Sequence, residues 1–187
     1  MRRALLLAAA ALPLALALTA CPIPQPLAEV ARSTDGGTVS TPIILTDTAV
    51  PPDTVVPVRT DCSPAAQFTL SATVEDLDTS ESVEARWFMD YGTGHGLLLE
   101  DEESVPASED PSDPRRLVTP VQFTPYAYGV PPAIGLHVVE LVVSNGFLAL
   151  SDPTPPLQRA AAPPFVTQAY RWVFQYVDPS DPRGRCQ

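Results

Sequence analysis

Hydrophobic and polar residues alternate with a period of two in three segments of the chain. They are residues 67–75 (QFTLSATVE), 83–91 (VEARWFMDY) and 167–177 (TQAYRWVFQYV). Successive side chains of a β-strand point to opposite faces of its sheet, so this period predicts three half-buried strands. The segment 167–177 is expected to be a C-terminal strand.

Two further segments carry strand signals together with a turn or a breaker. Residues 135–150 (GLHVVELVVSNGFLAL) contain a β-branched run, then Asn145-Gly146, then a second apolar run. Asn-Gly accepts the positive φ angles of a type I′ turn, which predicts a two-residue β-hairpin. Residues 117–124 (LVTPVQFT) read as a strand that Pro120 interrupts, and proline favours a sheet edge.

The aromatic residues of these strands are expected to fill the core. They are Trp87, Phe88, Tyr91, Trp172, Phe174 and Tyr176. The alternative is that Phe88, or another of them, faces solvent in a recognition patch.

The segments between the expected strands are rich in turn-forming residues. Residues 76–82 form a break, residues 92–116 a long acidic loop, and residues 152–164 a proline-rich irregular stretch. The sequence DPSDPR, at 110–115 and again at 178–183, predicts turns because Asp bonds nearby amides and Pro presets φ. Short strands separated by turns, with no long stretch of helical period, predict an all-β sandwich.

Three places carry a resemblance to a known kind of domain. SATVEDLDTSESVEARWFMDY looks like two strands around an acidic turn, and IGLHVVELVVSNG like a late strand ending in a polar turn. The strand expected after Asn145-Gly146 would complete the hairpin. Over residues 61–151 the chain resembles bacterial immunoglobulin-like domains of the PKD or cadherin-like kind. The resemblance implies an immunoglobulin-like antiparallel β-sandwich with Trp87 buried. The acidic loop 92–116 and the strand 167–177 depart from the family pattern and leave the strand order open.

The N-terminus has the layout of an export signal. Arg2 and Arg3 precede fifteen apolar residues, 4–18, which Pro13 interrupts. A membrane-spanning helix needs about 20 apolar residues, so this stretch is too short to span well. Leu18-Thr19-Ala20-Cys21 follows directly and resembles the lipobox of bacterial lipoproteins.

That resemblance implies that residues 1–20 are a signal peptide and that Cys21 becomes an acylated first residue. Pro22, where aspartate would favour the inner membrane, indicates the outer membrane of a Gram-negative bacterium. An ordinary secretory signal and an uncleaved anchor are the alternatives. With Cys21 acylated, Cys62 and Cys186 are left as a predicted disulfide, the alternative being two free thiols.

Residues 21–60 are interpreted as a lipidated N-terminus and a disordered tether. The stretch has seven prolines after Cys21 and no aromatic residue, so it offers little to build a core. The alternative is that PIIL or DTVVPV, within this stretch, adds an edge strand to the domain. The predicted sandwich domain covers residues 61–187.

The composition and charge of the chain restrict the classes of molecule that it is expected to bind. The chain has 187 residues, 23 of them proline, and a net charge of −11; its 11 basic residues are all arginine. Removal of residues 1–20 leaves 9 arginines against 22 acids. This charge repels phosphate backbones and anionic headgroups, so we expect no nucleic-acid partner and attachment to the membrane only through the lipid. Without lysine there is neither a Schiff-base lysine nor a P-loop lysine.

Acidic clusters are the only candidates for a metal site. Glu75, Asp76 and Asp78, or residues 100–103, could supply oxygens to Ca²⁺, which takes 6–8 of them. A solvated acidic loop is the preferred interpretation. His95 lies in a glycine-rich turn and His137 at a strand entrance, where it is expected to be half-buried and structural; two separated histidines do not make a zinc site.

These observations predict a lipid-anchored cell-envelope protein that presents a non-catalytic β-sandwich for binding or structural assembly. No cofactor is expected. An envelope protein or a glycan is the expected partner, with loop 92–116 as the contact. One alternative is a carbohydrate-active or other hydrolytic envelope enzyme, or an accessory domain, that uses loop carboxylates. Another is an assembly component that adds a strand at a sheet edge.

Overall fold

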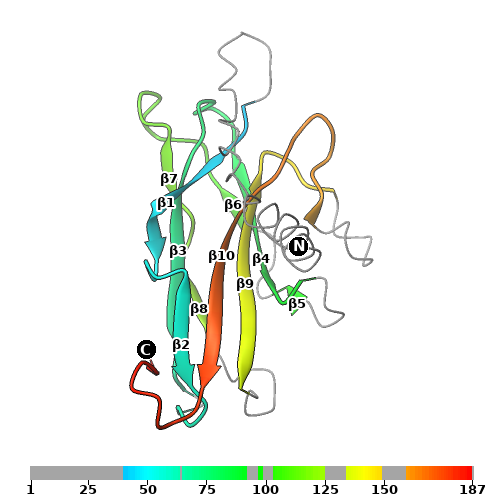
Figure 1. Ribbon diagram of the computed structural model, residues 1–187. Coiled ribbons are helices and arrows are strands. Elements are labelled where there is room, and N and C mark those ends of the chain that lie inside the picture. The colour runs from blue at the N-terminus through cyan, green and yellow to red at the C-terminus, as the bar shows by residue number, and fades with distance from the viewer. Residues whose placement is uncertain are drawn as a thin grey trace, which may run out of the picture. The chain divides into compact units, whose positions relative to one another are not determined.

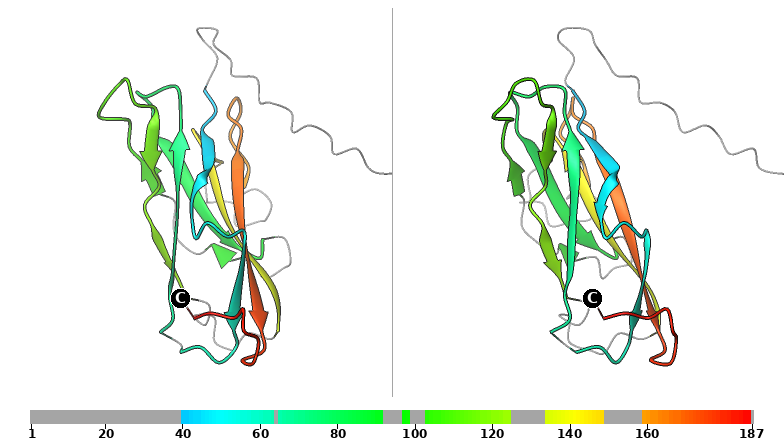
Figure 2. Two further views of the ribbon diagram at one scale, coloured as in Figure 1. Left: turned by 60° about the vertical axis from the view of Figure 1, so that its left-hand side comes forward. Right: turned by 90° about the vertical axis from the view of Figure 1, so that its left-hand side faces the viewer.

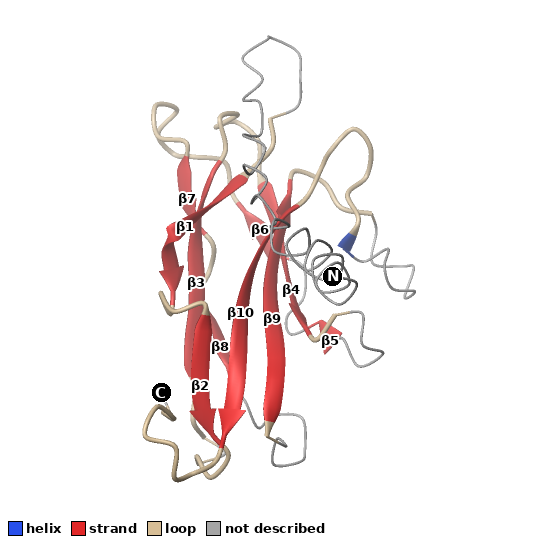
Figure 3. Cartoon of the chain, viewed as in Figure 1, coloured by secondary structure: helices blue, strands red, loops and turns tan. Residues whose placement is uncertain are grey.

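A computed structural model describes residues 40–63, 65–91, 97–98, 103–124, 134–148 and 159–186 (Figure 1). These residues form ten β-strands: β1 (Ile43–Val50), β2 (Val55–Arg59), β3 (Phe68–Glu75), β4 (Val83–Met89), β5 (Leu97–Leu98), β6 (Glu103–Val105), β7 (Arg115–Leu117), β8 (Val121–Phe123), β9 (Gly135–Ser144) and β10 (Gln168–Val177). Strands and loops make up nearly all of the described chain (Figure 3). The prediction of an all-β fold is confirmed.

The strands form two sheets that pack face to face (Figure 2). One has the order β1–β3–β7, with β8 also on β3, and the other has the order β2–β10–β9–β4, with β5 and β6 on β4. Every strand pair is antiparallel except β2–β10, which is parallel. The predicted sandwich is therefore confirmed, with one correction to "antiparallel". β1 and β2 are successive parts of one extended segment that passes from the first sheet to the second.

The two N-terminal strands correct the predicted domain boundary. Residues 43–50 and 55–59 lie inside the range interpreted as a tether, yet they form β1 and β2. Each is an edge strand, as in the alternative interpretation of this stretch. Val56 and Val58 are fully buried. A segment without aromatic residues therefore joins the core because other strands supply the aromatic rings.

The core lies between the sheets, and aromatic rings from both sheets meet in it. Trp87 of β4 stacks on Trp172 of β10 with ring centroids 5.7 Å apart. The ring of Phe174 lies 5.4 Å from Phe68 and 4.5 Å from Phe123, both of the opposite sheet. The predicted core role of Trp87, Trp172 and Phe174 is confirmed, and β10 confirms the predicted C-terminal strand.

A second, smaller apolar cluster lies on the outer face of the six-stranded sheet. It contains Phe88, Val142 and Phe147, with Tyr91 packed against them. Phe88 is only 1% exposed, so the alternative that it forms a surface patch is wrong.

The predicted hairpin at Asn145-Gly146 is wrong. β9 already pairs with β10 on one side and β4 on the other, so no edge is free for a returning strand. Beyond Gly146 the chain pairs with a distant segment, through a bridge between Phe147 and Ala161. Among the described residues that are not glycine, only Asp90 has a positive φ, so Asn145 does not adopt the type I′ conformation.

The range 92–116 is not one continuous loop. β5 and β6 pair with β4, and β7 begins at Arg115 and pairs with β3. Residues 92–96 and 99–102 lie outside the described residues, as do 149–158. Pro120 separates β7 from β8, and both lie on the outer side of β3, which confirms the interrupted edge strand.

Candidate functional site

Only some of the sequence-predicted site residues lie in the described part of the chain. Cys21, His95 and residues 100–102 lie outside it. The structure places Cys62, Cys186, Glu75, Asp76, Asp78, Glu103 and His137, and both copies of DPSDPR.

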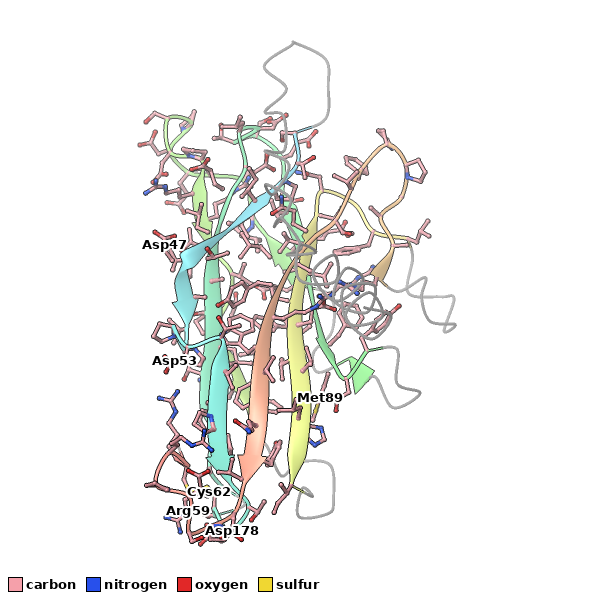
Figure 4. The ribbon with its side chains drawn as sticks, viewed as in Figure 1. Asp47, Asp53, Arg59, Cys62, Met89 and Asp178 are labelled. Atoms are coloured by element: carbon pink, nitrogen blue, oxygen red, sulfur yellow. A yellow bond between two sulfur atoms is a disulfide. The ribbon has the colours of Figure 1, made fainter. Side chains whose placement is uncertain are left out.

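Cys62 and Cys186 form the predicted disulfide, with an S–S distance of 2.01 Å. It joins the turn after β2 to the segment after β10. Figure 4 shows Cys62 beside Arg59 and Asp178 at one end of the sandwich. Ser40, the first described residue, enters at the opposite end, where the 76–82 and 106–114 turns lie (Figure 2).

A buried carboxylate organises the end of the sandwich at which the described chain begins. Asp76 follows β3 directly and its Oδ1 accepts hydrogen bonds from the Ser40 hydroxyl and, at 3.1 Å, from the Asp78 amide. Its Oδ2 accepts one from Asn145 Nδ2 at 2.7 Å and lies 3.2 Å from a guanidinium nitrogen of Arg116. We call Ser40, Asp76, Arg116 and Asn145 the Asp76 cluster.

Both charges of this cluster are withdrawn from water. The side chain of Asp76 is 0% exposed and that of Arg116 is 6% exposed. Arg116 also donates to the carbonyl of Glu81 at 2.5 Å and to that of Pro106 at 3.3 Å, which ties two turns together. Four segments of the chain therefore meet at one ion pair, whose oxygens are occupied by protein donors.

The calcium candidates do not converge on a common point. Glu75 lies 3.7 Å from Arg115, and Asp78 Oδ1 accepts the hydroxyl of Ser80 at 2.6 Å. That hydroxyl and the Ser80 amide hold the pKa of Asp78 below its usual value. Across the described ranges, no group of three or more His, Cys, Asp or Glu side chains could hold a metal ion.

The two DPSDPR copies adopt the same turn, which confirms the turn prediction. Asp110 Oδ1 accepts the amide and hydroxyl of Ser112 at 2.8 and 2.7 Å. Asp178 Oδ1 accepts those of Ser180 at 2.8 and 2.5 Å. The serine hydroxyl, followed by the amide, lowers the pKa of each aspartate. Because the flanking sequences differ, the six residues alone specify this geometry.

Two bidentate ion pairs lie close in sequence to the disulfide cysteines. Arg59 donates to both carboxylate oxygens of Asp61, at 2.9 and 2.6 Å. Arg183 does the same to Asp181, at 3.0 and 2.7 Å. The hydrogen bond from Arg183 lowers the pKa of Asp181 to about 2.

A histidine–aspartate pair joins the end of β4 to the start of β9. Asp90 has φ of 49°, and its Oδ1 accepts the Val138 amide at 2.7 Å. Its Oδ2 lies 2.6 Å from His137 Nδ1, and the His137 ring packs edge-on against Tyr176 at 4.9 Å. His137 is half-buried in a structural contact, as predicted; the role of Asp90 was not anticipated from the sequence.

A charged cluster covers the outer face of the six-stranded sheet. Glu140 Oε1 accepts hydrogen bonds from Arg159 at 2.7 Å and Arg171 at 2.6 Å. Arg86 donates to the Leu148 carbonyl at 3.0 Å and lies 4.3 Å from the centre of the Phe147 ring. The alternation of residues 83–91 puts Arg86 on the face opposite to Trp87, and the segment around Phe147 covers it there. Nothing local in the sequence signals that cover.

A scan against protein-family models finds no match, and neither a search of curated proteins nor one of solved structures finds a similar chain. Within the ranges that the structure describes, there is no helix long and apolar enough to cross a bilayer.

Proposed function

We propose that this chain is a lipid-anchored protein of the bacterial cell envelope, which presents a non-catalytic β-sandwich for binding or structural assembly. The observation that carries the proposal is the block Leu18-Thr19-Ala20-Cys21, directly after a short apolar stretch. Two or three acyl chains on Cys21 give stable attachment, which a single chain does not.

The cysteine pairing supports export and anchoring. The chain has three cysteines, and Cys62 is bonded to Cys186, which leaves Cys21 as the odd one. Disulfides persist in oxidising compartments such as the periplasm and the cell surface. An exported protein with one unpaired cysteine at the end of its signal sequence is the arrangement that lipidation requires.

The strand order supports an immunoglobulin-like sandwich. β1–β3–β7 corresponds to strands A, B and E of such domains, and β10–β9–β4 to strands G, F and C. Trp87 lies in β4, where the C-strand tryptophan is expected. The disulfide departs from this pattern, because it does not join the B and F strands.

The position of Ser40 determines which end of the sandwich is connected to the anchor. The described chain begins at Ser40, at the end of the sandwich opposite to Cys62 (Figure 4). Residues 22–39 span at most about 65 Å when fully extended. An anchor at Cys21 thus holds the domain by its Ser40 end and presents the disulfide end to a partner, an envelope protein or a glycan.

The buried acids favour a binding or structural role over hydrolysis. Asp76, Glu140 and Asp90 each bond to groups that hold the fold together. Carboxylates engaged in this way are poorly placed to act as a general acid or base on a substrate.

Intact mass of the protein from membranes of a Gram-negative host tests the anchor. We expect an N-terminus at Cys21 that carries acyl mass, and a Cys21→Ser variant that loses both the acyl mass and the membrane association. Pro22→Asp is the matched control for location, since it keeps the acylation and shifts the protein toward the inner membrane. A mature protein that begins at another residue, or that lacks acyl mass, would overturn the proposal.

A further inference from the structure

The outward edge of β2 is covered by a single residue from the far end of the chain. Thr54 and Thr60 face β10, since the Thr54 carbonyl accepts the Val173 amide at 2.8 Å and the Thr60 amide donates to Val177 at 3.1 Å. By the two-residue period of a strand, Pro57 and Arg59 face away from β10. Their backbone groups would be an open edge if nothing paired with them.

Arg185 pairs with this edge as an added strand does. Its amide donates to the Pro57 carbonyl at 3.0 Å, and its carbonyl accepts the Arg59 amide at 3.2 Å. The bridge between Val58 and Arg185 is parallel. Between Pro57 and Arg59 the edge thus offers one acceptor and one donor, spaced for one residue of an extended peptide.

Side-chain contacts at the same place select a Gly-Arg pair. The Arg185 guanidinium lies 2.7 Å from an oxygen of Asp53. A Cβ on Gly184 would lie 2.5 Å from Arg59 Cγ and 2.9 Å from Val177 Cγ2, so a larger residue does not fit without a shift. The site therefore restricts the first position to glycine and favours arginine at the second.

A covalent bond holds the occupant in place. Cys186, next to Arg185, is bonded to Cys62. The ion pair between Arg185 and Asp53 is exposed, at 40% and 59% of the two side chains, and such pairs hold a segment weakly. The disulfide is therefore the covalent restraint on residues 184–186, added to their backbone hydrogen bonds with β2.

We propose that the outer edge of β2 is a binding site for an extended peptide segment containing Gly-Arg, which residues 184–185 occupy in the oxidised protein and which reduction of the Cys62–Cys186 disulfide opens. This inference goes beyond the proposed function; it rests on the export of the chain to the envelope but not on the lipid anchor. The ligand adds a strand parallel to β2, as in other cases of β-strand addition.

The opening step is a thiol–disulfide exchange with an envelope dithiol protein. A thiolate of the dithiol attacks Sγ of Cys186, which belongs to the more exposed of the two residues, and Cys62 leaves as a thiolate that takes up a proton. The second thiol of the dithiol then attacks the mixed disulfide and releases Cys186. Two electrons pass to this chain, and the dithiol becomes a disulfide.

The test uses the full-length exported protein with Cys21→Ser, which removes the third thiol. The probe is a fluorescent peptide of residues 178–187 with serine in place of Cys186. We expect it to bind at least about tenfold more tightly after dithiothreitol treatment than before it. Two control peptides, one with valine at the Gly184 position and one with glutamate at the Arg185 position, should not bind.

Hydrogen exchange supplies a second readout. Reduction should speed exchange of the Arg59 amide at least about tenfold, while the amides of Val56 and Val58 stay protected. Unchanged exchange at Arg59, or equal binding of probe and control peptides, would overturn the proposal.

A second variant covers the case in which reduction unfolds the protein. Arg185→Glu keeps the disulfide but places a like charge beside Asp53. It should speed exchange of the Arg59 amide. Arg183 pairs with Asp181 in its own turn, so Arg183→Glu should leave that rate unchanged. Equal rates in the two variants would count against selection of arginine at this edge.

Discussion

In the described part of the chain, the buried charges of Asp76, Arg116 and Glu140 each have an ion-pair partner. Asp76 and Arg116 meet inside the Asp76 cluster, and Glu140 accepts two arginines on the outer face of the six-stranded sheet. A charge withdrawn from water is tolerated only when paired and hydrogen-bonded, so removing one partner leaves the other uncompensated. Single substitutions at such positions should therefore have large effects.

Asp76→Asn tests the Asp76 cluster. The Nδ2 group of the new side chain would face the donors of Arg116 and Asn145, and Arg116 would lose its counter-charge. We expect a loss of about 3–5 kcal/mol in the free energy of unfolding, measured by urea denaturation. The control is Asp47→Asn on exposed β1 surface, with an expected change within about 0.5 kcal/mol. Similar losses of stability in the two variants would mean that the Asp76 cluster stabilises the fold no more than an exposed aspartate does.

Two substitutions at Asp90 distinguish the cost of its backbone conformation from the contribution of its side-chain hydrogen bonds. Asn tolerates the φ of 49° and its Oδ1 can still accept the Val138 amide, so Asp90→Asn should cost about 1 kcal/mol or less. Asp90→Ala keeps the unfavourable φ and loses both side-chain hydrogen bonds, so it should cost about 2–3 kcal/mol. Chemical denaturation of both variants measures the difference. Equal losses would mean that the carboxylate bonds contribute little.

The neighbours of each strand determine whether it lies inside a sheet or at an edge. β10 lies between β2 and β9, and β9 lies between β10 and β4, so neither has an edge to offer. β1, β2, β7 and β8 lie at edges and are short or interrupted, in part by proline. Pro51 links β1 to β2, and its carbonyl accepts the Trp172 indole N–H at 3.0 Å. β1 and β2 thus complete a core whose rings come from β3, β4, β8 and β10.

Truncation tests the domain boundary. A shortened protein that begins at residue 61 lacks β1 and β2, including buried Val56 and Val58. It should give no cooperative thermal transition, whereas one that begins at Asp35 should keep the transition of the mature chain, as followed by tryptophan fluorescence. A cooperative transition in the shorter protein would show that residues 43–59 are dispensable.

At the scale of the whole molecule, the disulfide and the surface aspartates set the response to redox conditions and pH. Cys62 and Cys186 are 124 residues apart in sequence. Cross-linking so distant a pair restricts the unfolded chain strongly in the chain-entropy model. Several surface aspartates have a lowered pKa because serine or arginine donors stabilise their charged form.

Loss of the disulfide should lower stability without abolishing the sheets. We expect the Cys62→Ser, Cys186→Ser double variant to lose about 2–5 kcal/mol in the free energy of unfolding. Wild type measured with and without dithiothreitol should differ by a similar amount, while the double variant should not respond. A response of the double variant to dithiothreitol would mean that the reagent acts elsewhere.

The lowered pKa values of these aspartates predict that the free energy of unfolding decreases at acid pH. In the folded state Asp181 has a pKa of about 2, below the ordinary value of 3.8, so the unfolded state binds more protons in this interval. Stability from this group is present above about pH 4 and is lost as the pH falls toward about 2. NMR titration of Asp181 measures the pKa directly. Arg183→Ala should move it toward 3.8, and no movement would contradict the assigned cause.

The sequence by itself determined the features that depend on adjacent residues. Alternation identified the central strands 67–75, 83–91 and 167–177, and the Asp-Pro turns followed from six residues each, because a strand's faces and a turn's side-chain bonds are local. The count of three cysteines, with Cys21 set apart, predicted the disulfide between Cys62 and Cys186.

Only the tertiary structure decided which segments complete the sandwich. β1 and β2 belong to it because distant strands supply the rings that they cover, and the hairpin fails because β4 and β10 occupy both sides of β9. The cover over Arg86, the donors to Asp76 and the pairing of Arg185 with β2 likewise join residues far apart in sequence. The periodicity of one segment carries no information about its neighbour, so contacts of this kind cannot be derived from local pattern.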